Sequence, residues 1–222
     1  KRAKQGDKEA LVRAPVMEKA IAALSAGQPA RTVKVTDDEK SAFDGLQLLT
    51  AKPVLYICNV DEGSAASGNA FSKAVAEMAT AEGASSVIIS AAIEAEVAQL
   101  PPEEQTEFLA SMGLDEPGLN KVIRAGYSLL GLLTFFTVGP KEARAWTVHK
   151  GAKAPQAAGA IHTDFEHGFI RAETIAYDDF VALGGESACR EAGKLRQEGK
   201  EYPVKDGDIF QRLTSWKRLR IC

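Results

Sequence analysis

Two apolar segments without polar alternation constrain the fold of this chain more than any other feature. Residues 52–59 are KPVLYICN and residues 85–91 are SSVIISA, and continuous apolar runs of this kind are typical of parallel strands covered on both faces. Between them, residues 70–83 (AFSKAVAEMATAEG) have a helical pattern that ends at Gly83. Strand, helix and strand form a βαβ unit, so the sequence predicts an α/β fold.

Further helices are expected on both sides of this unit. Met17, Ile21 and Leu24 recur at helical spacing, which predicts a helix from Ala14, with Pro15 in its first turn, whose narrow apolar stripe suits one arm of a helical hairpin. Thr36 is expected to cap a helix over residues 37–49, where acidic residues favour the first turn. Residues 101–113 and 116–131 each have Pro near the start and Gly at the end, and two more helices are predicted there.

The character of the chain changes near Leu132, where we expect a domain boundary. From Thr134 onward the pattern predicts short strands with turns between them and little helix, over residues 134–139, 143–151, 168–180 and 201–213. Up to Leu132 there are 13 Lys and Arg against 18 Asp and Glu, whereas from Leu133 the counts are 14 and 12. The second part is therefore the better candidate for contact with RNA.

Composition excludes several classes of protein. The net charge of -3 argues against a surface made mainly for nucleic acid, and no DNA partner is expected. Apolar runs fall short of the roughly 18 residues of a spanning helix, and no signal peptide pattern opens the chain, so no membrane is expected. Cys58, Cys189 and Cys222 are odd in number and scattered, which favours a reducing cytoplasm.

The end of the first predicted strand carries a candidate site for a nucleotide base. Ligands of α/β sheets lie beyond the carboxyl ends of the strands, where Asn59 stands. Its amide can donate to and accept from a purine edge, and the carboxylate of Glu62 can accept from N–H groups. The guanine-reading pattern is Asn-Lys-x-Asp, but here Val60 replaces the Lys and Glu62 the shorter acid. Guanine preference should be weakened or lost, and an ordinary loop with solvated acids remains the alternative.

The second predicted strand is followed by Ser90, Ala91 and Ala92. GTP-binding proteins with the Asn-Lys-x-Asp pattern carry a Ser-Ala-Lys turn at this place, and a backbone N–H of that turn meets the base. A phosphate loop of the form GxxxxGKS/T is absent from the sequence. Residues 193–201 (GKLRQEGKE) have the wrong spacing and are interpreted as a helix end and a turn. By itself the chain is therefore not expected to hydrolyse a nucleotide.

A second dense group consists of His162, Asp164, Glu166 and His167, in a segment expected to be a strand and a turn. The spacing matches no standard ligand pattern, and side chains on a strand would not all face one way. A structural or recognition role is favoured, and no metal site is predicted. No Ser-His-Asp or Cys-His arrangement can be assigned.

Several segments resemble the Obg-like ATPase (YchF) family: NVDE (59–62), residues 116–130, residues 135–175 and KDGD (205–208). The resemblance implies a P-loop ATPase of the translation-factor class that prefers ATP to GTP. It implies one coiled-coil arm over residues 1–30, the distal part of a G-type nucleotide-binding domain over 31–132, and a TGS domain with a β-grasp fold over 133–222. The chain starts without Met, the first being Met17, so we expect it to be the latter part of a longer protein.

Carried over by position, the resemblance implies that Asn59, Val60 and Glu62 read adenine and that Ser90, Ala91 and Ala92 close over it. ATP and Mg²⁺ are the implied cofactors, with the phosphate loop and the Mg²⁺ ligands upstream of this chain. No catalytic residue is expected within it.

The ribosome or ribosomal RNA is the implied partner. Candidate phosphate contacts are Lys141, Arg144, Lys150, Lys153 and Arg171, although a solvated strand face explains any one of them as well. A non-enzymatic TGS module that binds RNA or the ribosome is the alternative function. The ending IFQRLTSWKRLRIC departs from the Phe-rich last strand of the family, and Lys217, Arg218 and Arg220 there form a basic cluster.

Overall fold

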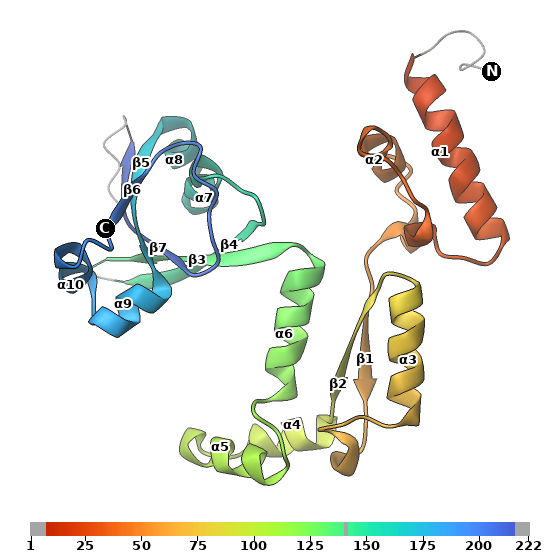
Figure 1. Ribbon diagram of the computed structural model, residues 1–222, viewed down its shortest axis with the longest axis horizontal. Helices are drawn as coiled ribbons and strands as arrows, with labels where there is room; N and C mark the ends of the chain where they lie inside the picture. Colours follow the sequence, from red (N-terminus) through yellow and green to blue (C-terminus); the bar gives the residue numbers. More distant parts are fainter. Residues whose placement is uncertain (1–7, 140–141, 216–222) are drawn as a thin grey trace. The chain divides into compact units, whose positions relative to one another are not determined.

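The computed structural model describes residues 8–139 and 142–215 (Figure 1). The chain divides into two compact units, Lys1–Leu129 and Leu130–Cys222. Lys141 and the basic cluster at residues 217–220 lie outside the described residues. None of the helices in the described part combines the length and apolar character that a membrane crossing requires.

The first unit contains the predicted βαβ motif. Strands β1 (Leu55–Asn59) and β2 (Ser85–Ile89) pair in parallel, with Asn59 opposite Ile89. Helix α3 (Ala70–Ala81) connects them, and both α3 and α6 (Gly118–Leu129) pack against the strands, which lie between the two helices (Figure 1). The prediction of full burial was wrong for β1, because the described sheet has only two strands and Ile57 is 50% exposed.

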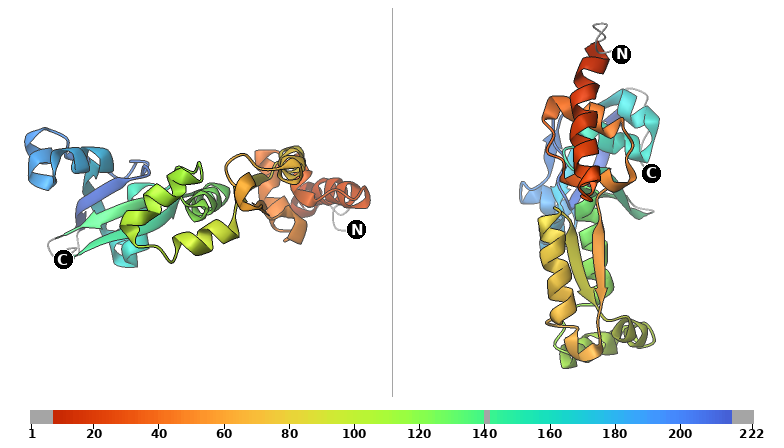
Figure 2. Two further views of the ribbon diagram at one scale, coloured as in Figure 1. Left: turned by 90° about the horizontal axis from the view of Figure 1, so that it is seen from below. Right: turned by 90° about the vertical axis from the view of Figure 1, so that its right-hand side faces the viewer.

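The helices before β1 form a small core of their own. Helix α1 (Lys8–Ser25) lies beside α2 (Asp37–Asp44) (Figure 2). The short 3-10 turn η2 (Ala30–Thr32) lies between them in the sequence, and η3 (Leu49–Ala51) follows α2. Val16, Ala20, Ala30 and Phe43 are buried here. Thr36 is the N-cap of α2, as predicted, and its N–H donates to the Glu39 carboxylate over 3.1 Å.

The predicted apolar stripe of the first helix is exposed, and a different face of the helix packs on α2. Met17, Ile21 and Leu24 are 43%, 59% and 41% exposed, while Val16 and Ala20 face the core. The helix also extends back to Lys8, so Pro15 lies inside it rather than in its first turn. Residues 8–14 (KEALVRA) are mostly strong helix formers, which explains the additional turns.

An ion pair joins these helices to the βαβ motif. The Arg31 guanidinium of η2 pairs with Glu82, which follows α3, and the Tyr56 hydroxyl of β1 donates to the same carboxylate over 3.1 Å. The hydrogen bond from Arg31, followed by that from Tyr56, lowers the pKa of Glu82. Three separate segments of the first unit are thereby held together.

A second small core is formed by segments that follow the carboxyl ends of β1 and β2. It is built by α4 (Ala91–Val97) and α5 (Pro102–Ser111), with Ile93, Val97, Leu109 and Leu114 buried. Ala65, which follows the 3-10 turn η4 (Glu62–Ser64), also belongs to it. Helices α5 and α6 confirm the predictions for residues 101–113 and 116–131, whereas α4 was not predicted.

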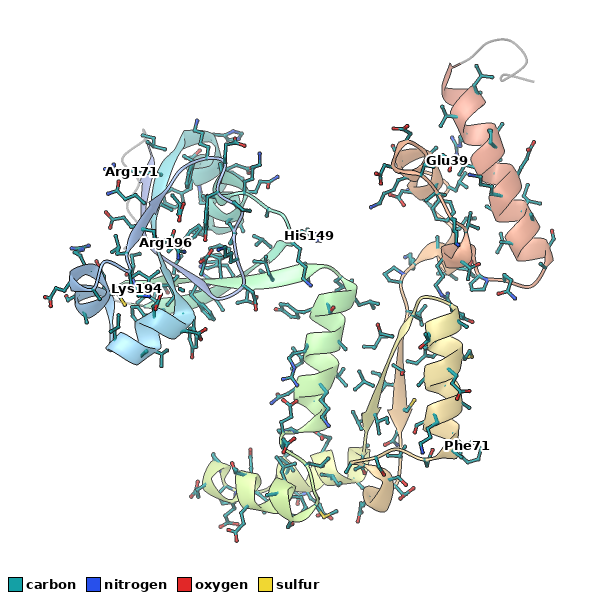
Figure 3. The ribbon with its side chains drawn as sticks, viewed as in Figure 1. Glu39, Phe71, His149, Arg171, Lys194 and Arg196 are labelled. Atoms are coloured by element: carbon teal, nitrogen blue, oxygen red, sulfur yellow. The ribbon has the colours of Figure 1, made fainter. Side chains whose placement is uncertain are left out.

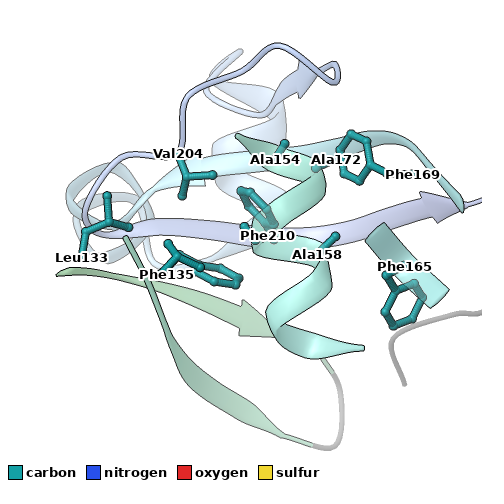
Figure 4. Close-up of a cluster of buried hydrophobic side chains, with 11 residues drawn as sticks. Leu133, Phe135, Ala154, Ala158, Phe165, Phe169, Ala172, Val204 and Phe210 are labelled. Atoms are coloured by element: carbon teal, nitrogen blue, oxygen red, sulfur yellow. The ribbon is translucent and has the colours of Figure 1, made fainter. Parts of the chain in front are cut away.

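The second unit is a mixed five-stranded sheet in the order β4-β3-β7-β5-β6. Its strands are β3 (Leu132–Val138), β4 (Ala143–His149), β5 (Phe169–Ala176), β6 (Arg196–Glu198) and β7 (Asp208–Ser215). The central β3 and β7 run parallel, and the other pairs are antiparallel. Helices α7 (Ala154–Ile161) and α8 (Thr163–Gly168) contribute Ala158 and Phe165 to a core around Phe135 and Phe210 (Figure 4).

The expectation of little helix in this unit was wrong. Besides α7 and α8, it contains α9 (Tyr177–Leu183) and α10 (Glu186–Glu191). The strand expected over 168–180 ends at Ala176, where Asp178 and Asp179 favour a helix N-terminus, and the strand expected over 201–213 begins only at Asp208. Residues 193–201, which were interpreted as a helix end and a turn, also contain the short strand β6. Helices this short have too few turns for a clear period in sequence.

Candidate functional site

The carboxyl ends of β1 and β2 bring several predicted residues together. The Val60 N–H donates to the Ile89 carbonyl over 2.9 Å, which extends the strand pairing by one residue. The side-chain oxygen Oδ1 of Asn59 accepts the N–H of Ala91 over 2.9 Å. Because Oδ1 is engaged by a donor, the Nδ2 group of the exposed Asn59 side chain is the part left to donate to a ligand.

The two acids after Asn59 have different surroundings. Asp61 caps η4, since its Oδ1 accepts the Ser64 N–H and its Oδ2 the Ser64 hydroxyl, both over 3.0 Å. Glu62 is the first residue of η4 and its side chain is exposed. Asp61 therefore stabilises its own turn, and Glu62 is the acid that remains open to a ligand.

The segment from Ser90 to Ala92, predicted as a turn that meets the base, leads into a helix. Ser90 is the N-cap of α4, and the helix starts at Ala91. The Ala91 N–H is already taken by Asn59, so it cannot serve a base in this arrangement. The Ser90 side chain is 3% exposed, and its Oγ has no hydrogen-bond partner among the described residues. A buried hydroxyl without a partner is uncommon in folded proteins.

The four predicted cationic residues that the structure describes do not form one cluster. Arg144 of β4 lies over the Trp146 ring at 4.4 Å, and Lys150 is exposed just after β4. Lys153 pairs with Glu201, and Arg171 of β5 donates to the side-chain oxygen Oε1 of Gln197 over 3.0 Å. Strands β3 and β7 separate β4 from β5, so Arg171 belongs to a different part of the sheet (Figure 3).

The histidine-rich segment lies on a helix, not on a strand and turn. His162 precedes α8, and its Nδ1 accepts the Asp164 N–H over 3.1 Å. Its ring meets Phe165 edge-on at 6.2 Å. Within residues 8–139 and 142–215 no three His, Cys, Asp or Glu side chains are grouped so that they could hold a metal ion. This segment therefore caps and packs a helix.

Glu94 is a residue at this site that the sequence did not single out. Its carboxylate accepts the N–H of Gly118 over 2.6 Å and that of Leu119 over 3.2 Å. The contact joins α4 to the start of α6 across 24 residues of sequence. No local pattern signals a contact at that separation.

Comparisons with known proteins agree on one family. The family described as YchF-GTPase_C, protein of unknown function (DUF933), matches residues 132–214. The curated "Ribosome-binding ATPase YchF" of Haemophilus ducreyi is 53% identical over 210 residues, which is 95% of this chain and 58% of that protein. The protein of the same name from Escherichia coli O157:H7 is 51% identical over 213 residues, 96% of this chain and 58% of its own length. The chain thus spans less than two thirds of these relatives.

Two solved structures share the fold, and one of them carries the family name. The Schizosaccharomyces pombe YchF GTPase has a TM-score of 0.78 and 35% identity, over 90% of this chain and 53% of that one. A GTP binding protein from Pyrococcus horikoshii has a TM-score of 0.52 and 21% identity over 90% of this chain and 56% of that one, which shows a shared fold.

Proposed function

This chain belongs to the YchF family and corresponds to the C-terminal portion of its members. We propose that it is part of a ribosome-associated, cytoplasmic ATPase that prefers ATP to GTP. Its own part would be to read the base and to contact the ribosome. The observation that carries this proposal is the pair of Asn59 and Glu62 at the end of β1. Asn59 offers an amide donor and Glu62 an open carboxylate on the same loop.

Adenine suits this pair better than guanine. Adenine has one exocyclic amine as its only donor beside ring nitrogen acceptors, and an amide with a single carboxylate can satisfy such an edge. Guanine offers adjacent ring and exocyclic N–H groups, which suit the short Asp of Asn-Lys-x-Asp. The acid at that position here is Glu62, and the neighbouring Asp61 is engaged with Ser64.

The phosphates and Mg²⁺ would be held by residues outside this chain, since its sequence contains no phosphate loop. Such residues supply positioning and charge stabilisation for phosphoryl transfer to water. The greater length of the relatives and the half-exposed Ile57 on β1 support additional elements packed against this strand. The chain alone would not hydrolyse ATP.

A titration of the full-length protein with fluorescent ATP and GTP analogues tests this function. ATP should bind more tightly than GTP, because Glu62 replaces the guanine-reading Asp. Equal affinity, or tighter GTP binding, would contradict the assignment of the base site.

The second unit and helix α1 support the two other domains that the family implies, a TGS domain and a coiled-coil arm. Helix α7 packed on a mixed sheet with parallel central strands supports a TGS domain of β-grasp type in the second unit. The exposed stripe of Met17, Ile21 and Leu24 supports pairing of α1 with a second coiled-coil arm. The names of the relatives support a ribosomal partner.

The exposed edge strand β4 favours a second candidate, a non-enzymatic module that contacts ribosomal RNA. Arg144 and Lys150 are exposed on or just after this strand, and Trp146 lies under Arg144. Basic and aromatic groups side by side can contact both phosphates and bases. This candidate needs no ATP.

Replacing both Arg144 and Lys150 with alanine should weaken binding to ribosomes and reduce the slope of log affinity against log salt by about 2, since each phosphate contact contributes about 1. Co-sedimentation with ribosomes at several salt concentrations measures both quantities. Lys200→Ala, which removes one exposed charge elsewhere in the unit, is the control. A double variant that binds like this control would exclude the β4 surface.

A further inference from the structure

Glu94 connects the candidate base site to the start of α6. Its two carboxylate oxygens accept the N–H groups of Gly118 and Leu119, which are the first two residues of that helix. The first N–H groups of a helix have no partner within it, and negative charge is favourable there. The carboxylate therefore caps the N-terminus of α6 with both of its oxygens.

The fit at Gly118 leaves no space for a side chain. A Cβ atom at this buried glycine would lie 2.9 Å from Glu94 Oε1 and 3.0 Å from Ile89 Cγ2. Ile89 is the last residue of β2, and its carbonyl accepts the Val60 N–H. The start of α6 is thus in direct contact with the strand end that carries the base site.

On its other side, α4 is held by Asn59. Ala91, the first residue of this seven-residue helix, donates its N–H to Asn59 Oδ1, and Glu94 stands three positions later. Ile93 between them is 1% exposed and anchors the helix in the core. Because Ala91 and Glu94 lie on one short helix, that helix connects the Asn59 contact directly to the Glu94 contact.

We propose that Glu94 is a positioning residue that couples occupancy of the base site to the order of the α6 N-terminus. This coupling rests on the proposed adenine-reading function of Asn59 and Glu62. By linkage, a ligand that stabilises the Asn59–Ala91 contact stabilises the Glu94–α6 contact, and loss of the second contact weakens binding of the ligand to the same degree. In the sequence, α6 leads directly into the second unit.

Three variants of the full-length protein test the coupling: Glu94→Ala, Glu94→Gln and the control Glu96→Ala. Glu96 lies on the same helix with an exposed side chain. Two quantities are measured: the affinity for a fluorescent ATP analogue, and the hydrogen exchange of the amides of residues 118–120 with and without ATP. In the wild type and in Glu96→Ala, ATP should slow this exchange.

In Glu94→Ala the slowing by ATP should disappear, and ATP should bind about fivefold or more weakly, the lower range of typical coupling. Glu94→Gln keeps one acceptor oxygen, so its ATP affinity and its slowing of exchange by ATP should lie between those of the wild type and Glu94→Ala. The test therefore does not depend on the alanine variant being stably folded. If Glu94 were only a structural cap, exchange would be faster in Glu94→Ala, yet ATP would slow it by the same factor as in the wild type.

If ATP slows the exchange in Glu94→Ala by the same factor as in the wild type, or if both Glu94 variants bind ATP with wild-type affinity, the coupling alone is overturned. A wild-type protein that does not bind ATP would overturn the proposed function and the coupling with it. The two failures are therefore distinguishable in one experiment.

Discussion

Asn59→Ala is expected to weaken ATP binding by the full-length protein about 5- to 150-fold, which corresponds to about 1–3 kcal/mol for a polar group of the bound base left without its partner. The variant loses the amide donor that faces the ligand. It also loses the acceptor that holds the Ala91 N–H over 2.9 Å. Isothermal titration with ATP measures the change, and unchanged affinity would exclude Asn59 as a base-reading residue.

Asn59→Asp separates the two roles of this side chain. Aspartate keeps an oxygen for the Ala91 N–H but has no N–H group to donate to a base. If the donor is what ATP requires, Asn59→Asp should bind as weakly as Asn59→Ala. Retained affinity in Asn59→Asp would mean that Asn59 acts by holding α4 and not by contacting the base.

Asp208→Ala is expected to lower the unfolding free energy of the second unit by about 3 kcal/mol. Asp208 is 2% exposed, and its Oδ2 accepts the Tyr202 hydroxyl and the Lys205 N–H, each over 2.8 Å. Arg196 Nη2 lies 3.4 Å from Oδ1. Burial, and next the hydrogen bond to Asp208, raises the pKa of Tyr202. The value is at the lower end for a broken buried pair because the Arg196 side chain is 39% exposed and retains water.

Urea unfolding followed by tryptophan fluorescence measures this effect. Both tryptophans, Trp146 and Trp216, fall within residues 130–222, so the signal reports the second unit. Asp178→Ala, an exposed acid in the first turn of α9, is the control and should change the free energy by no more than about 0.5 kcal/mol. Equal midpoints for the Asp208 and Asp178 variants would show that the buried network contributes little.

Local patterns were enough to predict much of the first unit. The apolar runs at 52–59 and 85–91 predicted β1 and β2, the Thr36 cap predicted α2, and Pro and Gly positions predicted α5 and α6. Asn59 could be placed at a strand end because the run stops there. Each of these signals is contained in a few neighbouring residues, whose backbone preferences and spacing do not depend on distant parts of the chain.

Contacts between distant segments could not be predicted in this way. The helices α7 to α10 have six to eight residues each and are stabilised by packing on a sheet rather than by a strong period of their own. Exposure of the Met17 stripe depends on which face of α1 meets Phe43. The separation of Arg171 from Arg144 follows from β7 pairing between β3 and β5.

The sequence by itself determined the βαβ motif, the family resemblance and the identity of the base-site candidates Asn59 and Glu62. Only the tertiary structure decided which atoms of that site are already engaged. It showed that Asn59 Oδ1 and the Ala91 N–H satisfy each other, that Asp61 is occupied by Ser64, and that Glu94 closes α6. The physical reason is that a hydrogen bond depends on atoms brought within about 3 Å in space, and sequence spacing does not report that distance for residues 24 or 32 positions apart.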